Sequence, residues 1–252
     1  MHFQIERGKE MKKSKIFALI LCTAFLSVTT VLGTLAYLTS RDSVANTFTV
    51  GDVQITLDEH PVDENGKQVA DCPAEGCVRV KENQYHVVPG ETYDKDPMVT
   101  VKADSEPSYV RMIMTVHNAS AVQAIVDNSV HQLNDYADLF AGWDQESWLY
   151  EGFEADAGAN TIAFEFRYFD KNSQKDVADA SGLTEDLELP ALFTQLVVPG
   201  TVTNAELKAL YGNPEDPEGD FKIVVEAHAI QAATFADADA AWAAFDVQNA
   251  SN

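Results

Sequence analysis

The sequence IAFEFRY, residues 162–168, is the clearest amphipathic strand pattern in the chain. Ile162, Phe164, Phe166 and Tyr168 fall on one side of an extended backbone, and the residues between them fall on the other. An apolar repeat of period two predicts a strand with one buried face. This stretch therefore favours a sheet-based fold.

Toward the N-terminus, SYVRMIMTV at residues 108–116 alternates in the same way. Its even-numbered residues, from Val110 to Val116, share one face, and Tyr109 and Ile113 make the other face apolar as well. A strand with two apolar faces belongs in the middle of a sheet. We expect residues 108–116 to form a central strand.

Other segments show shorter apolar runs or alternation, separated by turn residues. Further strands are expected within residues 46–58, 98–102, 189–198 and 221–229. Many short strands separated by turns predict a mainly β, two-sheet sandwich. We expect residues 37–252 to form a single domain of this type, with insertions near residues 58–84 and 118–142.

Three segments follow a helical pattern instead. Apolar residues at spacings of three, four and seven predict a helix from about Ala121 to Phe140. Residues 204–211 predict a short helix, and the Ala-rich stretch 237–245 predicts a C-terminal helix. The sandwich is therefore expected to carry a long helical insertion and a short C-terminal helix.

The N-terminus has the three parts of a secretory signal peptide. Lysines within residues 12–15 form a positive region, residues 16–32 carry no charge, and small residues lead to Ala36. We expect cleavage between Ala36 and Tyr37, with residues 1–10 as an upstream extension. The alternative is a permanent membrane anchor, which needs about 20 apolar residues. The stretch is slightly short for that and contains several Thr and Ser.

The chain is strongly acidic, with a formal net charge of −23. The acidic excess is larger still after Ala36, because residues 1–36 carry five basic and two acidic residues. Nucleic acids and anionic membranes require a positive surface, so neither is expected as a partner of the mature chain. The membrane is expected as a partner only during export.

Two cysteines flank a short, turn-rich segment in the first insertion. Cys72 and Cys77 lie close enough to staple the tip of a hairpin in an exported protein. Such a small loop would add roughly 2 kcal/mol through chain entropy. Metal binding by the pair is the alternative, although no second pair exists to complete a zinc site.

The chain carries few residues in patterns that indicate catalysis. It contains no HExxH zinc motif and no GxSxG nucleophile elbow. We therefore expect a protein that is not an enzyme and has no cofactor, with calcium as the possible exception. The calcium candidates are Asp94, Asp96, Glu215, Asp216, Glu218 and Asp220, although solvated acidic turns are the more common role of such clusters.

Seven segments of the chain have a distinctive sequence: residues 33–39, 45–53, 88–92, 94–97, 109–111, 226–232 and 240–242. Together they resemble the TasA/camelysin family of exported proteins from Gram-positive bacteria, released by a dedicated signal peptidase of the SipW-dependent type. The N-terminal block is the most specific part of the match. The Cys72–Cys77 loop and the helical insertion depart from the simplest members of the family.

The resemblance implies a jelly-roll-like sandwich and a subunit, or accessory protein, of extracellular biofilm fibres. Its partners would be itself or a related fibre subunit, and the signal peptidase during export. In that family the N-terminal segment of one subunit adds a strand to the next. The anchors of that strand would here be Tyr37, Leu38, Val44 and Phe48. The segment could instead fold into its own domain.

Two other functions are carried as alternatives. Camelysin-type members are assigned a metallopeptidase activity, but this chain lacks the usual zinc motif. A cell-surface module that binds a host or carbohydrate ligand could use Trp143, Trp148 and Trp242 as platforms, although core packing is the more common role of tryptophan.

Overall fold

The computed structural model describes residues 39–42, 53–69, 78–126, 139–211 and 221–249. Within them the chain is mainly β, with three antiparallel sheets and a few short helices. The sequence-based expectation of a mainly β protein is confirmed at this level.

The largest sheet has five strands and contains both strands that decide the fold class. In spatial order they are β1 (Thr39–Asp42), β11 (Ile223–Gln231), β5 (Ser108–His117), β8 (Thr161–Tyr168) and β7 (Trp148–Asp156). In β5, Met112 lies between Ala227 of β11 and Phe166 of β8. The prediction of a central strand is confirmed, because β5 has neighbours on both sides.

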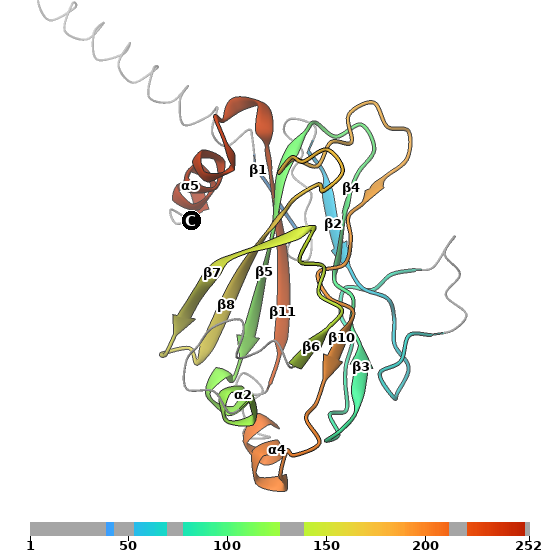
Figure 1. The fold of residues 1–252 in the computed structure, drawn as a ribbon, viewed down its shortest axis with the longest axis vertical. Coiled ribbons are helices and arrows are strands. Elements are labelled where there is room, and N and C mark those ends of the chain that lie inside the picture. The colour runs from blue at the N-terminus through green and yellow to red at the C-terminus, as the bar shows by residue number, and fades with distance from the viewer. Residues whose placement is uncertain (1–38, 43–52, 70–77, 127–138, 212–220, 250–252) are drawn as a thin grey trace, which may run out of the picture.

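Two three-stranded sheets lie on one side of the five-stranded sheet (Figure 1). One is β3 (Thr92–Asp94), β10 (Gln195–Val197) and β6 (Phe140–Ala141); the other is β2 (Ile55–Asp58), β4 (Met98–Val101) and β9 (Leu187–Glu188). All three sheets contribute to one buried cluster, in which Val99 and Val101 of β4 join Met114 and Phe164 of the large sheet. This shared core fixes the relative positions of the sheets.

The helices lie at the margins of the sheets. The C-terminal helix α5 (Ala238–Asn249) follows the short 3-10 helix η3 (Ala232–Thr234) and covers the side of the five-stranded sheet that faces away from the smaller sheets (Figure 1). Helices α2 (Ala119–Val126) and α4 (Asn204–Tyr211) contact each other at one end of the molecule. The predictions of a short helix at residues 204–211 and a C-terminal helix are confirmed.

The prediction of a helix from Ala121 to Phe140 is confirmed at its start and wrong at its end. Helix α2 is described to Val126, residues 127–138 lie outside the described part, and Phe140 belongs to strand β6. Phe140 pairs with Leu196 of β10 and packs on Phe193 at 4.7 Å between ring centroids. An apolar side chain suits a helix face and a strand face equally, so spacing alone could not separate the two.

The insertion near residues 58–84 has the pairing of a hairpin in its described part. Glu59 bridges Val80, and Val62 bridges Gln68, both antiparallel. The predicted disulfide pair, Cys72 and Cys77, lies outside the described residues.

Candidate functional site

The N-terminal strand β1 forms one edge of the five-stranded sheet. It runs antiparallel to β11, with Thr39 opposite Ile230 and Asp42 opposite Ala227. The described pairing between β1 and β11 comprises only four residue pairs. Tyr37, Leu38, Val44 and Phe48, the predicted anchors of a donated strand, lie outside the described residues, as does the predicted cleavage site after Ala36. Strand β1 therefore lies within the predicted donor segment.

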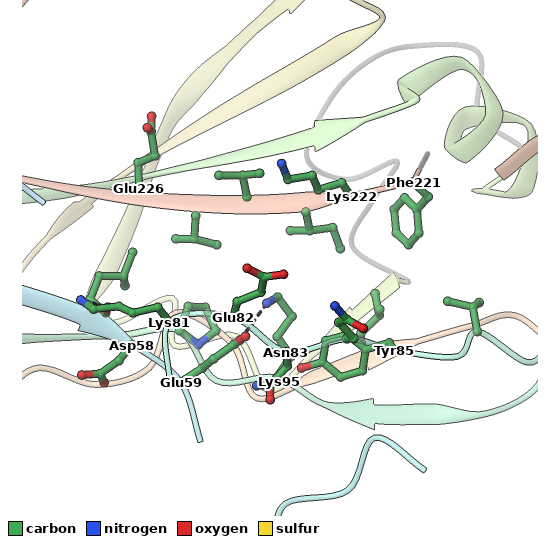
Figure 2. Close-up of a pocket in the computed structure, with 18 residues that line it drawn as sticks. Asp58, Glu59, Lys81, Glu82, Asn83, Tyr85, Lys95, Phe221, Lys222 and Glu226 are labelled. Carbon is green, nitrogen blue, oxygen red and sulfur yellow. Dashed lines mark hydrogen bonds and ion pairs between the residues drawn. The ribbon is translucent and has the colours of Figure 1, made fainter. Parts of the chain in front are cut away.

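A groove of about 620 Å³ runs beside the other half of β11 (Figure 2). Among the described residues, none pairs with Ile223–Glu226 on the side of β11 that carries β1. The segments Leu57–Glu59 and Lys81–Tyr85 lie across the groove from this half of the strand. The groove therefore opens along a strand edge.

The groove has an apolar floor and a charged rim. Leu57, Val87 and Leu196 contribute to the floor from one side, and Ile223 and Val225 from β11. Leu57, Ile223 and Val225 are only partly buried, although each packs against the main core. The rim carries both signs of charge, from Asp58, Lys81, Glu82, Lys222 and Glu226.

A buried ion pair forms one wall of the groove. Lys95 Nζ lies 2.7 Å from Glu59 Oε2, and the two residues are 9% and 5% exposed. The ring of Tyr85 lies 5.8 Å from the same ammonium group, and its hydroxyl donates to the carbonyl of Asp94 at 2.9 Å. Burial, followed by the negative charge of Glu59, raises the pKa of Tyr85 above its ordinary value. The phenol therefore remains protonated and keeps its hydrogen bond.

A second polar network ties the base of the hairpin to the turn after β3. Asp96 accepts from the backbone N–H of His60 at 2.8 Å, and its other oxygen lies 2.5 Å from His60 Nδ1. Arg79 donates through Nε to Asp58 at 2.5 Å and contacts Asp96 at 3.3 Å. Because Arg79 lies just before the Lys81–Tyr85 wall, this network holds that wall in place.

Of the two acidic clusters predicted as calcium candidates, one lies among the described residues and the other lies outside them. Asp94 accepts from the backbone N–H of Gln68, whereas Asp96 is bound to His60 and Arg79, so the two carboxylates have separate partners. The other four candidates, Glu215, Asp216, Glu218 and Asp220, lie outside the described residues. Within the described ranges, no three His, Cys, Asp or Glu side chains come together as a metal site would require.

The three tryptophans considered as ligand platforms pack inside the protein. Trp148 and Trp242 are both 2% exposed, and Trp143 stacks on Phe166 at 5.5 Å between ring centroids. Their positions correspond to the alternative of core packing.

No family model, curated protein or solved structure matches the chain. In the portion of the chain that the structure describes, no helix has the length and apolar character needed to cross a membrane.

The arrangement suits the binding of an extended peptide. A strand edge offers backbone N–H and C=O groups, and a neighbouring apolar floor can receive alternate side chains. The donor segment stays a prediction from the sequence, and sequence reasoning missed this groove. Its floor combines residues from β2, β10 and β11, which are far apart in the sequence. The one local signal of the groove was the hydrophobic repeat of β11, which continues to Ile223.

Proposed function

We propose that this chain is an exported subunit or accessory protein of an extracellular fibre, assembled by exchange of its N-terminal strand. The observation that carries the proposal is the position of β1, an edge strand that begins two residues after the predicted start at Tyr37 and, among the described residues, joins the sheet through β11 alone. A strand held at one edge can leave without disturbing the rest of the sheet.

Exchange of β1 between copies would preserve most of its interactions. The hydrogen bonds that β1 makes with its own β11 are the same bonds that it would make with the β11 of a neighbouring copy. Among the described residues, opening breaks four residue pairs, and the gain comes from any further contacts in the groove.

The groove supplies those further contacts in the proposed assembly. A donated segment that keeps the register of β1 would set Val44 opposite Val225, since Asp42 lies opposite Ala227. Val225 is part of the apolar floor, so Val44 beside it would be shielded from water. Phe48, four residues further on, would point to the same side of the strand.

The TasA/camelysin resemblance suggests where the protein acts and how it is exported. It supports cleavage of a SipW-dependent-type signal peptide, release from a Gram-positive cell, and a place in the biofilm matrix or on the cell surface. We also propose that the five-stranded sheet and the two smaller sheets form a jelly-roll-like sandwich, because they share one core.

The test compares chains that begin at Tyr37 and near Gly51, by size-exclusion chromatography and electron microscopy. We expect filaments from the longer chain and monomers from the shorter one, because only the longer chain carries the donor. If both chains stay monomeric over a range of pH, salt and calcium concentrations, strand exchange is excluded as the assembly mechanism.

A point variant tests the groove separately. Val225→Lys places a charge on the apolar floor and should reduce filament formation at least tenfold. The matched control is Val247→Lys, since Val247 is 71% exposed on α5 and should tolerate the same change. Thermal melting of both variants separates loss of assembly from loss of folding. Normal filaments from a folded Val225→Lys variant would argue against the groove as the acceptor.

A further inference from the structure

A row of basic residues crosses the five-stranded sheet. Arg41 of β1 lies opposite His228 of β11, His228 lies opposite Arg111 of β5, and Arg111 lies opposite Arg167 of β8. The whole chain has 17 Lys and Arg against 40 Asp and Glu, so four aligned basic residues are unusual for it. Helix α5 contacts His228, Arg111 and Arg167 of this row.

Arg111 is the centre of the contact between the row and α5. It is only 5% exposed, and its guanidinium lies 4.5 Å from the ring centroid of Trp242 and 5.0 Å from that of Phe245. It donates to Asp246 at 2.5 Å and to Glu165 at 3.4 Å. The guanidinium is therefore held by two aromatic rings and two carboxylates.

A second ion pair and a small apolar cluster complete the attachment of α5. Arg167 donates to Asp239 at 2.6 Å, near the first turn of the helix. Tyr109 and Ile230 of the sheet pack against Ala241, Trp242 and Phe245 of the helix, in a cluster separate from the main core. The helix therefore has its own apolar contact with the sheet and can open without disturbing the main core.

His228 lies at the inner side of this contact. It is 5% exposed, and its ring stacks on Phe245 at 4.8 Å between centroids. Arg111 donates through Nε to His228 Nδ1 at 3.2 Å. The acceptor nitrogen must carry a lone pair, so this hydrogen bond requires that Nδ1 is unprotonated.

Protonation of His228 would remove that hydrogen bond and create a buried cation beside another. Arg111 faces it from β5, and Arg41 lies opposite it in β1. The negative groups near the contact are Glu165 of β8 and Asp246 of α5, which already bind Arg111, and Glu226 lies two residues away on β11 itself. Asp239 of α5 is bound to Arg167. Glu165, Asp246 and Asp239 already bind arginines, so these three carboxylates compensate little for a further buried cation.

We propose that α5 is a pH-sensitive clasp, closed over the basic row while His228 is neutral and released when His228 takes up a proton. Release exposes Trp242, Phe245, Arg111 and Arg167 on a protein that is otherwise strongly acidic. Mild acidification thus uncovers an aromatic and basic surface, and this consequence does not depend on strand exchange.

The direction of the pH dependence follows from linkage. In the open form His228 is solvated and binds a proton near the ordinary histidine pKa of about 6.5. In the closed form, with α5 packed on the sheet, protonation of His228 is unfavourable. The open form, with α5 detached, therefore binds more protons below about pH 6.5. The population of the open form then rises by up to about tenfold per pH unit as the pH falls.

Hydrogen exchange of the α5 amides, corrected for the intrinsic effect of pH, tests the clasp on the full mature chain. We expect α5 protection to fall by up to about tenfold per unit between pH 6.5 and pH 5, while residues 112–116 of β5 stay protected. His228→Gln can still accept from Arg111 but cannot titrate, so it should remove the pH dependence. Protection that is constant with pH, or that falls equally in His228→Gln, overturns the proposal.

The matched control is His117→Gln. His117 also lies on the five-stranded sheet, and burial, followed by the charge of Lys222, lowers its pKa, but it lies at the far end of β5 from Arg111. This variant should keep the pH response of α5. If His228→Gln does not fold, an NMR titration of His228 in the unmodified chain replaces it. Uptake of the proton by His228 while α5 stays protected would then overturn the proposal.

Discussion

At the level of single residues, Glu59 and Lys95 show how a charged pair can be part of the structure. Both side chains are almost fully buried and face each other at 2.7 Å beside the groove. The desolvation of two charges is expensive and is offset only while both partners remain. Nothing in the sequence distinguishes Glu59 from the many other carboxylates of the chain, so this pair could not be predicted.

The pair gives a prediction for stability. Lys95→Met leaves the Glu59 carboxylate buried without its partner and should lower the free energy of unfolding by about 3–5 kcal/mol. Lys95→Met combined with Glu59→Leu removes both charges, and most of that loss should be recovered. Urea unfolding followed by fluorescence measures both variants. A double variant as unstable as the single one would show that the pair itself stabilises the fold.

At the level of elements, β11 is one strand with two different environments. Its first half, Ile223–Glu226, is partly exposed beside the groove, whereas Ala227–Ile230 is buried between the main core, β1 and α5. The same strand therefore provides the edge proposed for strand exchange and the histidine proposed for the clasp. Because β1 pairs only with the second half, exchange of β1 and opening of α5 act on neighbouring parts of the sheet.

Helix α4 begins with a capping box. The hydroxyl of Thr203 accepts from the backbone N–H of Glu206 at 3.3 Å, and the Glu206 carboxylate accepts from the backbone N–H of Thr203 at 2.7 Å. The bond from the backbone N–H of Thr203, followed by one that the Thr203 hydroxyl donates to the same carboxylate at 2.8 Å, lowers the pKa of Glu206. The reciprocal pair satisfies backbone donors that the first turn of a helix leaves unpaired.

Loss of this cap should have a measurable and local effect. We expect Thr203→Ala to lower the free energy of unfolding by about 1 kcal/mol. The exposed Thr201 provides the control, since Thr201→Ala changes the same side chain two residues before the cap. Urea unfolding measures the total effect, and hydrogen exchange should place it in α4. An equal loss in the two variants would indicate that the hydroxyl of Thr203 is not the cause.

At the level of the whole molecule, charge should control the rate of assembly. The full chain has a formal net charge of −23 and the mature copies are more acidic still, so they repel one another, whereas the groove rim carries both signs and adds little to that repulsion. From about 10 mM to about 1 M NaCl, the Debye length falls from ~30 Å to ~3 Å. Assembly by strand exchange should therefore accelerate several-fold over this range, as measured by light scattering.

Calcium at matched ionic strength distinguishes screening from specific binding. If screening alone acts, calcium and sodium chlorides should have similar effects. A much stronger effect of calcium, abolished by Asp94→Asn or by changes at residues 215–220, would instead support the calcium candidates predicted from the sequence.

The sequence by itself was sufficient where a hydrophobic repeat is complete within one segment. Strands β5 and β8 were predicted from local spacing, because burial of one face imposes a period on a short stretch of chain, and helices α4 and α5 were predicted from the local sequence. Local spacing was insufficient at Phe140, where pairing with a distant residue, Leu196, decided between helix and strand.

Only the tertiary structure decided which residues meet across the sheets. The groove beside Ile223–Glu226, the buried Glu59–Lys95 pair and the row from Arg41 to Arg167 all join elements that are distant in the sequence. Strand order and register set these contacts, and a shift of one residue in register would turn every side chain of a strand to the opposite face. Composition and local periodicity carry no information about that register, because it depends on the simultaneous packing of all the strands around one core.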